Sequence, residues 1–329
     1  MSGQTDVPLI EVDDLKVSFA SANGRIAALN GVSFSVRRGE VMALLGESGS
    51  GKSVTAATIM GLIDTPPGSI DGGAVRLEGT DLLRLQRAKH RQLCGAKISL
   101  IFQDALAALN PVYPVGWQIA ETFRIHGRLD RRQAHEEAVR LMEQVGIPAA
   151  RERAGLYPHQ FSGGMRQRVV IAMAIALRPP LVIADEPTTA LDVTVQAQIV
   201  ELLHRLREET GAGLILITHD LGVVAELADQ VAVMYAGRIV ERADVGTLFR
   251  KPAHPYTRGL LASQPRIDSD AAQLQPIPGT PPNPANIPSG CPFHPRCARA
   301  EAICAVDEPV LRPLGDGQSA ACHFAEATP

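Results

Sequence analysis

Gly46-Glu47-Ser48-Gly49-Ser50-Gly51-Lys52-Ser53 is the stretch that decides the fold. It follows the strand-like run Val41 to Leu45 and leads into a helix-like run from Ser53 to Leu62, which is the setting of a phosphate-binding loop. Successive N–H groups of such a loop surround the β- and γ-phosphates, its lysine places a point charge between them, and its serine hydroxyl reaches Mg²⁺. The sequence therefore predicts that Gly46 to Ser53 bind a nucleotide, with Lys52 and Ser53 in these two roles.

A second candidate anion site is Phe161-Ser162-Gly163-Gly164-Met165-Arg166-Gln167-Arg168, which stands before the apolar run Val169 to Leu177. The start of a helix exposes unpaired N–H groups and the positive end of the helix dipole, and glycines let a phosphate approach the backbone closely. The pattern indicates a phosphate clamp. Its alternative interpretation is an ordinary serine cap at the start of a buried helix.

Two further runs have the continuous apolar character of buried parallel strands and end in polar residues. Leu181 to Ala184 leads into Asp185-Glu186, and Leu214 to Thr218 leads into His219-Asp220. Ligands of such sheets bind at the carboxyl ends of the strands, so we expect Asp185 to hold Mg²⁺, Glu186 to act as a base on the attacking water, and His219 to hydrogen-bond the γ-phosphate. A solvated acidic loop and a structural histidine are the alternatives.

Together these segments resemble the nucleotide-binding subunits of ABC transporters, over roughly residues 9 to 250. The resemblance implies that Gln103, after the strand-like run Lys97 to Phe102, takes part in catalysis and Mg²⁺ binding and links the nucleotide site to the membrane subunits. It also implies that Phe19 stacks on adenine, although a phenylalanine in this run could equally be strand core. Thr189-Ala190-Leu191-Asp192 resembles the loop that crosses between two ATPase subunits.

The family usually carries Leu and Gln where this chain has Phe161 and Met165. Ser162, Gly163 and Gly164, the residues that would touch phosphate, remain. Since we find no internal repeat, each chain should carry one phosphate loop. The family arrangement then implies that ATP lies head to tail between two ATPase chains, identical or related, with the clamp of one on the nucleotide of the other. ATP would close this pair, and hydrolysis through Glu186 would open it.

We expect an α/β fold: a P-loop NTPase (RecA-like) core with an antiparallel β subdomain, an inserted α-helical subdomain and a cysteine-containing C-terminal extension. The core and the β subdomain are assigned to residues 1–102 and 166–250, the helical subdomain to 103–165 and the extension to 251–329. Apolar residues at helical spacing predict a helix that stops at Gly146, and another that starts at Asp192 and ends at Gly211.

Net charge and the distribution of apolar residues indicate where in the cell the protein acts. The chain has 329 residues and a net charge of −3, so no global basic field argues for nucleic acid. No apolar stretch reaches the ~18 residues needed to cross a bilayer, because Arg178 and Pro179 interrupt the longest candidate. The first six residues lack the basic and apolar regions of a signal peptide. We expect a peripheral protein on the cytoplasmic face of the cell membrane, held there by its partners.

The last part of the chain carries a second, more specific resemblance. The run Lys251 to Leu261 leads into a linker with six prolines between Pro276 and Pro288, too many for a helix or a sheet. Gly290-Cys291-Pro292-Phe293-His294-Pro295-Arg296-Cys297 follows. This extension resembles that of the ATPases of oligopeptide and dipeptide ABC importers, a group that includes nickel carriers. The partners implied are two multispanning permease subunits, a second ATPase subunit and, indirectly, an external solute-binding protein.

Cys291, Cys297, Cys304 and Cys322 gather in this extension, with five, six and seventeen residues between successive members. In a reducing cytosol such clustering favours a metal site over disulfides, although the spacing is not that of a zinc ribbon. Thiolates of this number fit either a [4Fe–4S] cluster or Zn²⁺, and the family resemblance favours iron and sulfur. Reduced structural thiols are the alternative.

A soluble ABC-type ATPase and a GTPase are the alternatives to a peptide importer. A soluble ABC-type ATPase acting on DNA or ribosomes usually carries two ATPase halves or a long coiled-coil insertion, and the sequence contains neither. A GTPase would need an Asn-Lys-x-Asp motif, which is absent. The transported solute, peptide or nickel chelate, is left open by the sequence.

Overall fold

The structure is a computed structural model that describes residues 7–22, 24–127, 129–189, 191–263 and 276–326. The chain divides into two compact units, each made of several segments. The first contains Met1–Leu9, Val36–Glu40 and Arg84–Leu216, and the second contains Ile10–Ser35, Val41–Leu83 and Ile217–Pro329. The domains expected from the sequence, a core, a helical subdomain and an extension, have other boundaries than these two units and stay a prediction.

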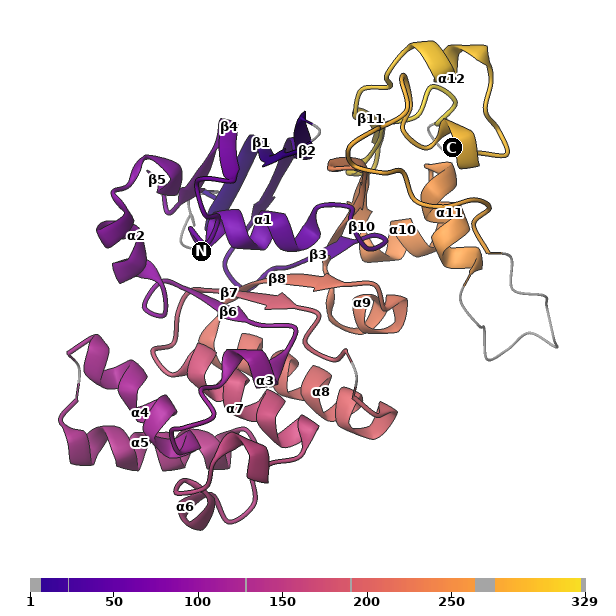
Figure 1. The fold of residues 1–329 in the computed structure, drawn as a ribbon. Helices are drawn as coiled ribbons and strands as arrows, with labels where there is room; N and C mark the ends of the chain where they lie inside the picture. Colours follow the sequence, from indigo (N-terminus) through magenta and orange to yellow (C-terminus); the bar gives the residue numbers. More distant parts are fainter. Residues whose placement is uncertain (1–6, 23, 128, 190, 264–275, 327–329) are drawn as a thin grey trace, which may run out of the picture. The chain divides into compact units, whose positions relative to one another are not determined.

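The first unit combines parallel strands with a group of helices (Figure 1). Its strands are β6 (Ile98–Ile101), β7 (Leu181–Asp185) and most of β8 (Gly213–Thr218, of which the first unit holds residues 213–216), with β7 between the other two. Its helical segments are α2 (Arg87–Leu93), α3 (Ala105–Ala108), α4 (Val115–Ile125), α5 (Arg131–Gln144), α6 (Ala150–Arg153), η2 (Pro158–Gln160), α7 (Gly163–Ile175) and α8 (Val193–Thr210).

Local signals set the ends of the long helices in this unit. Asp130 caps α5 by accepting from the N–H groups of Arg132 and Gln133, and Gly146 beyond its end has a φ of 77°. Asp192 caps α8, and Gly211 ends it with a φ of 64°. Both helices were predicted from apolar spacing, and the buried faces of α4, α5 and α7 pack against one another.

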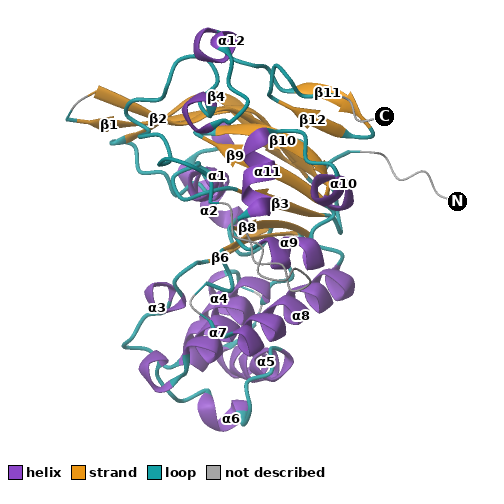
Figure 2. Cartoon of the chain, turned by 90° about the vertical axis from the view of Figure 1, so that its right-hand side faces the viewer, coloured by secondary structure: helices purple, strands orange, loops and turns teal. Residues whose placement is uncertain are grey.

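The second unit contains two groups of strands. β2 (Gly24–Val36), β1 (Ile10–Ser21), β4 (Gly68–Leu77) and β5 (Thr80–Asp81) lie in this order, with β1, β4 and β5 antiparallel. The other group, in spatial order, is β11 (Arg312–Gly315), β12 (Gln318–Ala320), β10 (Arg238–Asp244), β9 (Gln230–Tyr235) and β3 (Val41–Leu45). β3 and β9 are parallel and fully or largely buried, whereas β10 to β12 are antiparallel (Figure 2).

Short helices complete the second unit: α1 (Lys52–Ile59), η1 (Leu82–Arg84), α9 (Leu221–Leu227), α10 (Val245–Arg250), α11 (Pro255–Ala262), η3 (His294–Arg296) and α12 (Ala302–Val306). The expected architecture, a phosphate-loop core with an antiparallel sheet, helical insertion and extension, is confirmed. Among the described residues, no helix is both long and apolar enough to span a membrane.

The C-terminal extension is built into this unit by a buried carboxylate. β12 pairs with β10, placing Ala320 opposite Glu241. The Glu241 side chain is fully buried and accepts from the N–H groups of Ala253 at 2.7 Å and His254 at 2.8 Å, and from Gln318 Nε2 at 2.9 Å. Because its acceptors are satisfied by donors from two segments, residues 253–254 and Gln318, Glu241 fixes the extension to the core strand β10.

Candidate nucleotide site

The loop Gly46–Ser53 joins the buried strand β3 to helix α1. Lys52 is 6% exposed, and its Nζ donates to the carbonyl oxygens of Gly46 at 2.7 Å and Glu47 at 2.9 Å. Ser48, Gly49 and Ser53 lie on the exposed side. The loop therefore combines a buried cation with an exposed run of backbone at a helix start, which suits a polyphosphate.

Close packing explains the first and last glycines of the loop. A Cβ on Gly46, whose φ is 156°, would lie 2.3 Å from the carbonyl oxygen of Met234 in β9. A Cβ on Gly51, whose φ is 105°, would lie 2.7 Å from Leu29 Cδ2 and 2.9 Å from the carbonyl oxygen of Ala28. Both positions exclude a side chain by space as well as by backbone conformation.

In the first unit, Asp185 is the last residue of strand β7 and Glu186 follows it directly, as the sequence predicts. Glu186 Oε2 accepts from Gln103 Nε2 and from Thr189 Oγ1, both at 2.8 Å. Glu186 has a φ of 47°, a left-handed conformation that is uncommon for a residue with a side chain. The half-buried carboxylate is thus held from two directions at the carboxyl end of a buried strand, which suits a positioned general base.

The predicted clamp caps helix α7. Ser162 is the N-cap residue, and its Oγ accepts from the N–H of Met165 at 3.3 Å. Ser162 and Gly163 are exposed, whereas Phe161 is buried at 3% exposure. The cap and the clamp are therefore compatible interpretations, because one side of the helix start stays open to an anion.

Gly164 lies where helix α7 meets α8. A Cβ there would lie 2.5 Å from Val195 Cγ1. Asp192, which was assigned to the inter-subunit loop, accepts from the N–H of Val195 at 2.9 Å and caps α8. Ala190 of the same loop lies outside the described residues. The clamp consequently packs against the first turn of α8, the turn that Asp192 caps.

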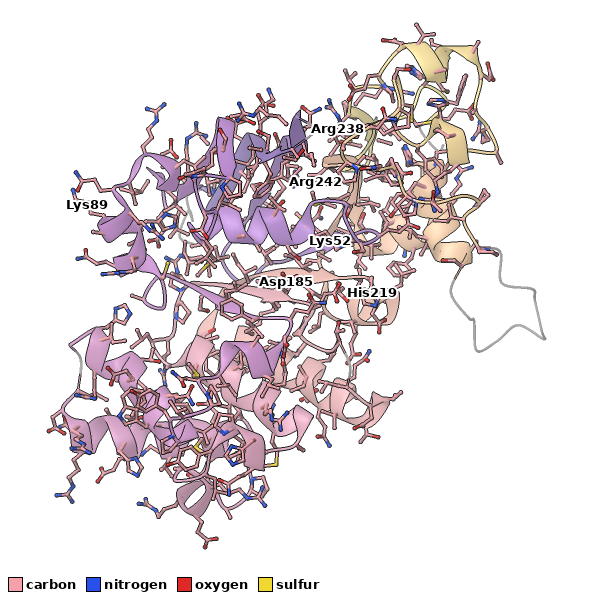
Figure 3. The ribbon with its side chains drawn as sticks, viewed as in Figure 1. Lys52, Lys89, Asp185, His219, Arg238 and Arg242 are labelled. Atoms are coloured by element: carbon pink, nitrogen blue, oxygen red, sulfur yellow. The ribbon has the colours of Figure 1, made fainter. Side chains whose placement is uncertain are left out.

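His219 and Phe19 belong to the second unit. His219 follows β8 and is exposed (Figure 3). The neighbouring Asp220 caps α9. Phe19 is a half-buried residue of β1 that lies opposite Gly68 of β4. The structure thus groups Gln103, Asp185, Glu186, Ser162 and Asp192 in one unit, and groups Phe19, the phosphate loop and His219 in the other.

The extension brings its cysteines around one small cavity. Cys291, Cys297, Cys304 and Cys322 line it together with His294 and His323, and it has a volume of about 20 Å³. None of the described cysteines is in a disulfide. Burial raises the pKa of Cys291 to about 11 and raises the pKa of Cys297, so both thiols are protonated at neutral pH unless a cation compensates.

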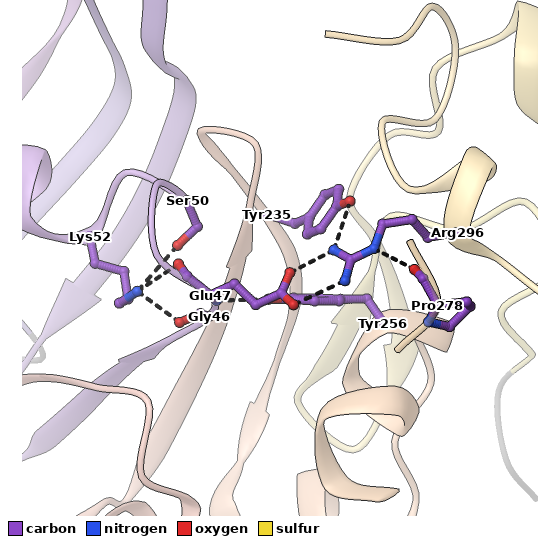
Figure 4. A network of polar contacts seen from close by, with 8 residues as sticks. All are labelled: Gly46, Glu47, Ser50, Lys52, Tyr235, Tyr256, Pro278 and Arg296. Atoms are coloured by element: carbon purple, nitrogen blue, oxygen red, sulfur yellow. Dashed lines mark hydrogen bonds and ion pairs between the residues drawn. The ribbon is translucent and has the colours of Figure 1, made fainter. Parts of the chain in front are cut away.

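The sequence missed the residues that hold the phosphate loop from the C-terminal side. Arg296 donates to the Glu47 carboxylate at 2.6 and 3.0 Å, and Tyr256 accepts from the Glu47 N–H at 2.8 Å (Figure 4). Arg296 stands within the cysteine-bearing stretch, where only the thiols were considered as functional groups. Its burial, which would have identified it, is visible only in the structure.

Two family models match the chain. One is described as "ABC transporter" and covers residues 29–189, and the other is described as "Oligopeptide/dipeptide transporter, C-terminal region" and covers residues 240–304. The oligopeptide transport ATP-binding protein OppD of Salmonella typhimurium is 49% identical over 314 residues, which are 95% of this chain and 93% of that protein. The dipeptide transport ATP-binding protein DppD of Escherichia coli is 47% identical over 316 residues, 96% of each chain.

Solved structures agree with these matches. A dimeric ATP-binding cassette in a post-hydrolysis state, bound to ADP and Pi, has a TM-score of 0.65 and 25% identity, covering 72% of this chain and 98% of its own. The cbiO1 protein of Clostridium perfringens, part of an ABC transporter complex, has a TM-score of 0.62 and 26% identity, covering 74% of this chain and 91% of its own.

Proposed function

Because the chain belongs to the ATP-binding subunits of ABC transporters, in the group named for oligopeptide and dipeptide transport, we propose that it energises peptide uptake across the cytoplasmic membrane. The chain is an ATPase. The observation that carries the proposal of peptides as cargo is similarity to OppD and DppD over nearly the whole chain, with the extension included.

We assign the chemical roles to the residues predicted from the sequence. The phosphate loop binds the polyphosphate, Phe19 stacks on adenine, and His219 hydrogen-bonds the γ-phosphate. Ser53, Gln103 and Asp185 offer the hydroxyl, amide and carboxylate oxygens that suit Mg²⁺, and none of them is fully buried. When bound, that ion neutralises charge on the phosphates. Glu186, oriented by Gln103 and Thr189, takes the proton from the attacking water.

We further propose a pair of ATPase subunits, identical or related, in which the clamp of one binds ATP held by the other. The exposed Ser162 and Gly163 at the start of α7, a helix of 13 residues, support this role. Solved cassettes of similar fold are dimeric.

The region around Gln103 offers an apolar surface for the membrane permease subunits. The side chains of Phe102, Leu106, Tyr113 and Trp117 are between 37% and 50% exposed, and the rings of Tyr113 and Trp117 stack at 4.2 Å. Exposed apolar groups gathered on one short stretch favour a protein partner. Binding there would place the ATPase as a peripheral subunit on the cytoplasmic face, with the external solute-binding protein reached only through the permease.

Peptide uptake tests the function directly. Deleting the gene should abolish uptake of labelled di- and oligopeptides, since ATP hydrolysis would no longer drive the transporter. The wild-type gene should restore uptake, and Glu186→Gln should not. Uptake of a free amino acid is the control. Normal peptide uptake in the deletion strain, or failure to co-purify with two multispanning membrane proteins, would contradict the proposal.

We propose that the extension's cysteines bind a metal, as a [4Fe–4S] cluster or as Zn²⁺. The four thiols suit either group in kind and line one cavity. Their present spacing does not fit: within the described ranges, no three His, Cys, Asp or Glu side chains are grouped to hold a metal ion. A cavity of about 20 Å³ holds roughly one water molecule, so the side chains would have to move apart around a cluster.

Metal analysis after anaerobic purification is expected to find iron with sulfide, or zinc, bound to the full chain. Cys304→Ser, which removes a buried thiol, should lower the metal content at least tenfold, because each thiolate contributes strongly to such a site. Cys94→Ser, outside the extension, is the matched control. A folded extension with neither metal would leave reduced thiols as the explanation.

A further inference from the structure

Glu47 of the phosphate loop is held through all of its polar groups. Its N–H donates to Tyr256 Oη at 2.8 Å, and its carbonyl oxygen accepts from Lys52 Nζ at 2.9 Å. Its carboxylate accepts from Arg296 Nη1 at 2.6 Å and Nη2 at 3.0 Å (Figure 4). Two of these partners, Tyr256 and Arg296, come from the C-terminal part of the chain.

Arg296 is itself fixed from several sides. Its Nε donates to the carbonyl oxygen of Pro278 at 2.9 Å, and its Nη1 also donates to Tyr235 Oη at 3.3 Å. The guanidinium carbon lies 5.9 Å from the centre of the Tyr235 ring and 6.0 Å from that of Phe293. The arginine side chain is 5% exposed, against 27% for the glutamate. A two-pronged pair in this setting is geometrically specific and little screened by solvent.

The segment carrying Arg296 is a tight turn. Around η3, the N–H of His294 donates to the carbonyl oxygen of Cys291 at 2.9 Å. The N–H of Cys297 donates to the carbonyl oxygen of His294 at 3.2 Å. Pro281 and Pro282 of the linker line the same hollow as Glu47 and Ser48. The folded extension therefore determines where the guanidinium lies relative to the loop.

We propose that Arg296 and Tyr256 are positioning residues for ATP binding, through which the C-terminal extension holds the phosphate loop in its binding shape. Arg296 also offsets the negative charge of Glu47, which would otherwise repel the polyphosphate. The inference rests on the assignment of Gly46–Ser53 as the phosphate site. It gives the extension a part in nucleotide affinity, separate from any part in cargo or metal binding.

Arg296→Ala in the full chain is expected to weaken equilibrium binding of a non-hydrolysable Mg-ATP analogue about tenfold, because one partner of a buried charge pair is left alone. In hydrolysis assays KM for ATP should rise by about the same factor, with kcat changed less than about twofold, since Glu186 is untouched. A merely structural defect would instead lower the active fraction and leave KM unchanged.

Arg238→Ala is the matched control. Arg238, labelled in Figure 3, pairs with Glu308 of the extension at 2.6 and 3.1 Å, which is also a bidentate contact between β10 and the extension. This pair does not include a residue of the phosphate loop. We expect its affinity for the analogue to match wild type. Equal affinities of Arg296→Ala and Arg238→Ala would overturn the inference.

Two further variants separate the causes. Glu47→Gln should weaken binding by only about threefold, and adding it to Arg296→Ala should cost less than the product of the single effects, because the residues act as a pair. Effects that simply multiply would refute the pairing.

Lys52→Ala separates a wrong phosphate-loop assignment from a wrong role for Arg296. If Lys52→Ala binds the analogue normally, the phosphate-loop assignment is wrong. If Lys52→Ala loses binding while Arg296→Ala does not, only the role of Arg296 is wrong.

Discussion

Glu186→Gln is expected to bind ATP with near-normal affinity and to hydrolyse it at least a hundredfold more slowly than wild type. The substitution preserves the size of the side chain, which is held by Gln103 and Thr189 at 2.8 Å each. It removes the basic oxygen, and general-base catalysis is worth about 10²–10⁴ in rate. Phosphate release under saturating Mg-ATP, together with equilibrium binding, measures the two properties separately.

Thr189→Val provides the control for this effect, because it removes one hydrogen bond to Glu186 while leaving the carboxylate in place. Its turnover should fall only by a few-fold, as expected for loss of one orienting contact. Near-normal hydrolysis by Glu186→Gln would refute the role assigned to Glu186 and direct attention to His219.

Gly46→Ala is expected to destabilise the fold by about 2–3 kcal/mol and to weaken ATP binding about a hundredfold or more. The new Cβ would lie 2.3 Å from the Met234 carbonyl oxygen, a backbone atom that cannot rotate away. Either the loop or strand β9 must shift, and a shift of about 1 Å in a binding loop is costly to function. Urea unfolding and ATP titration measure the two effects.

The control for backbone conformation is Gly79→Ala. Gly79, between β4 and β5, has a φ of 82°, but a Cβ added to it would meet no atom within 4 Å. The substitution should cost about 1 kcal/mol of stability, since an alanine tolerates this conformation poorly, and should leave ATP affinity unchanged. If Gly46→Ala behaved like Gly79→Ala, the close contact with Met234 would have no consequence.

The elements that the sequence predicted well are those with local causes. Continuous apolar runs identified β3, β7 and β8, because strands buried on both faces need no alternation. Asp192 and Gly211 marked both ends of α8. Helices often begin at a capping side chain such as aspartate and end at a left-handed glycine, so both residues can be recognised in a sequence. The contact between Gln103 and Glu186 follows from the pairing of β6 with β7, whose carboxyl ends meet.

The features that sequence reasoning missed depend on distant parts of the chain. Nothing near Glu47 indicates that its partner is Arg296, 249 residues later. The extension has no regular apolar period, so its joining of β12 to β10 through Glu241 could not be inferred from spacing. The left-handed conformation of Glu186 could not be predicted either, because this conformation is usually adopted by glycine and a glutamate gives no sign of it.

The distance along the chain between Glu47 and Arg296 also orders events during synthesis. A ribosome adding about 5–20 residues per second needs on the order of 12–50 s to pass from one to the other. Throughout that interval the phosphate loop of the emerging polypeptide lacks its arginine. The loop contact that we propose to support ATP binding can therefore form only after most of the chain has been made.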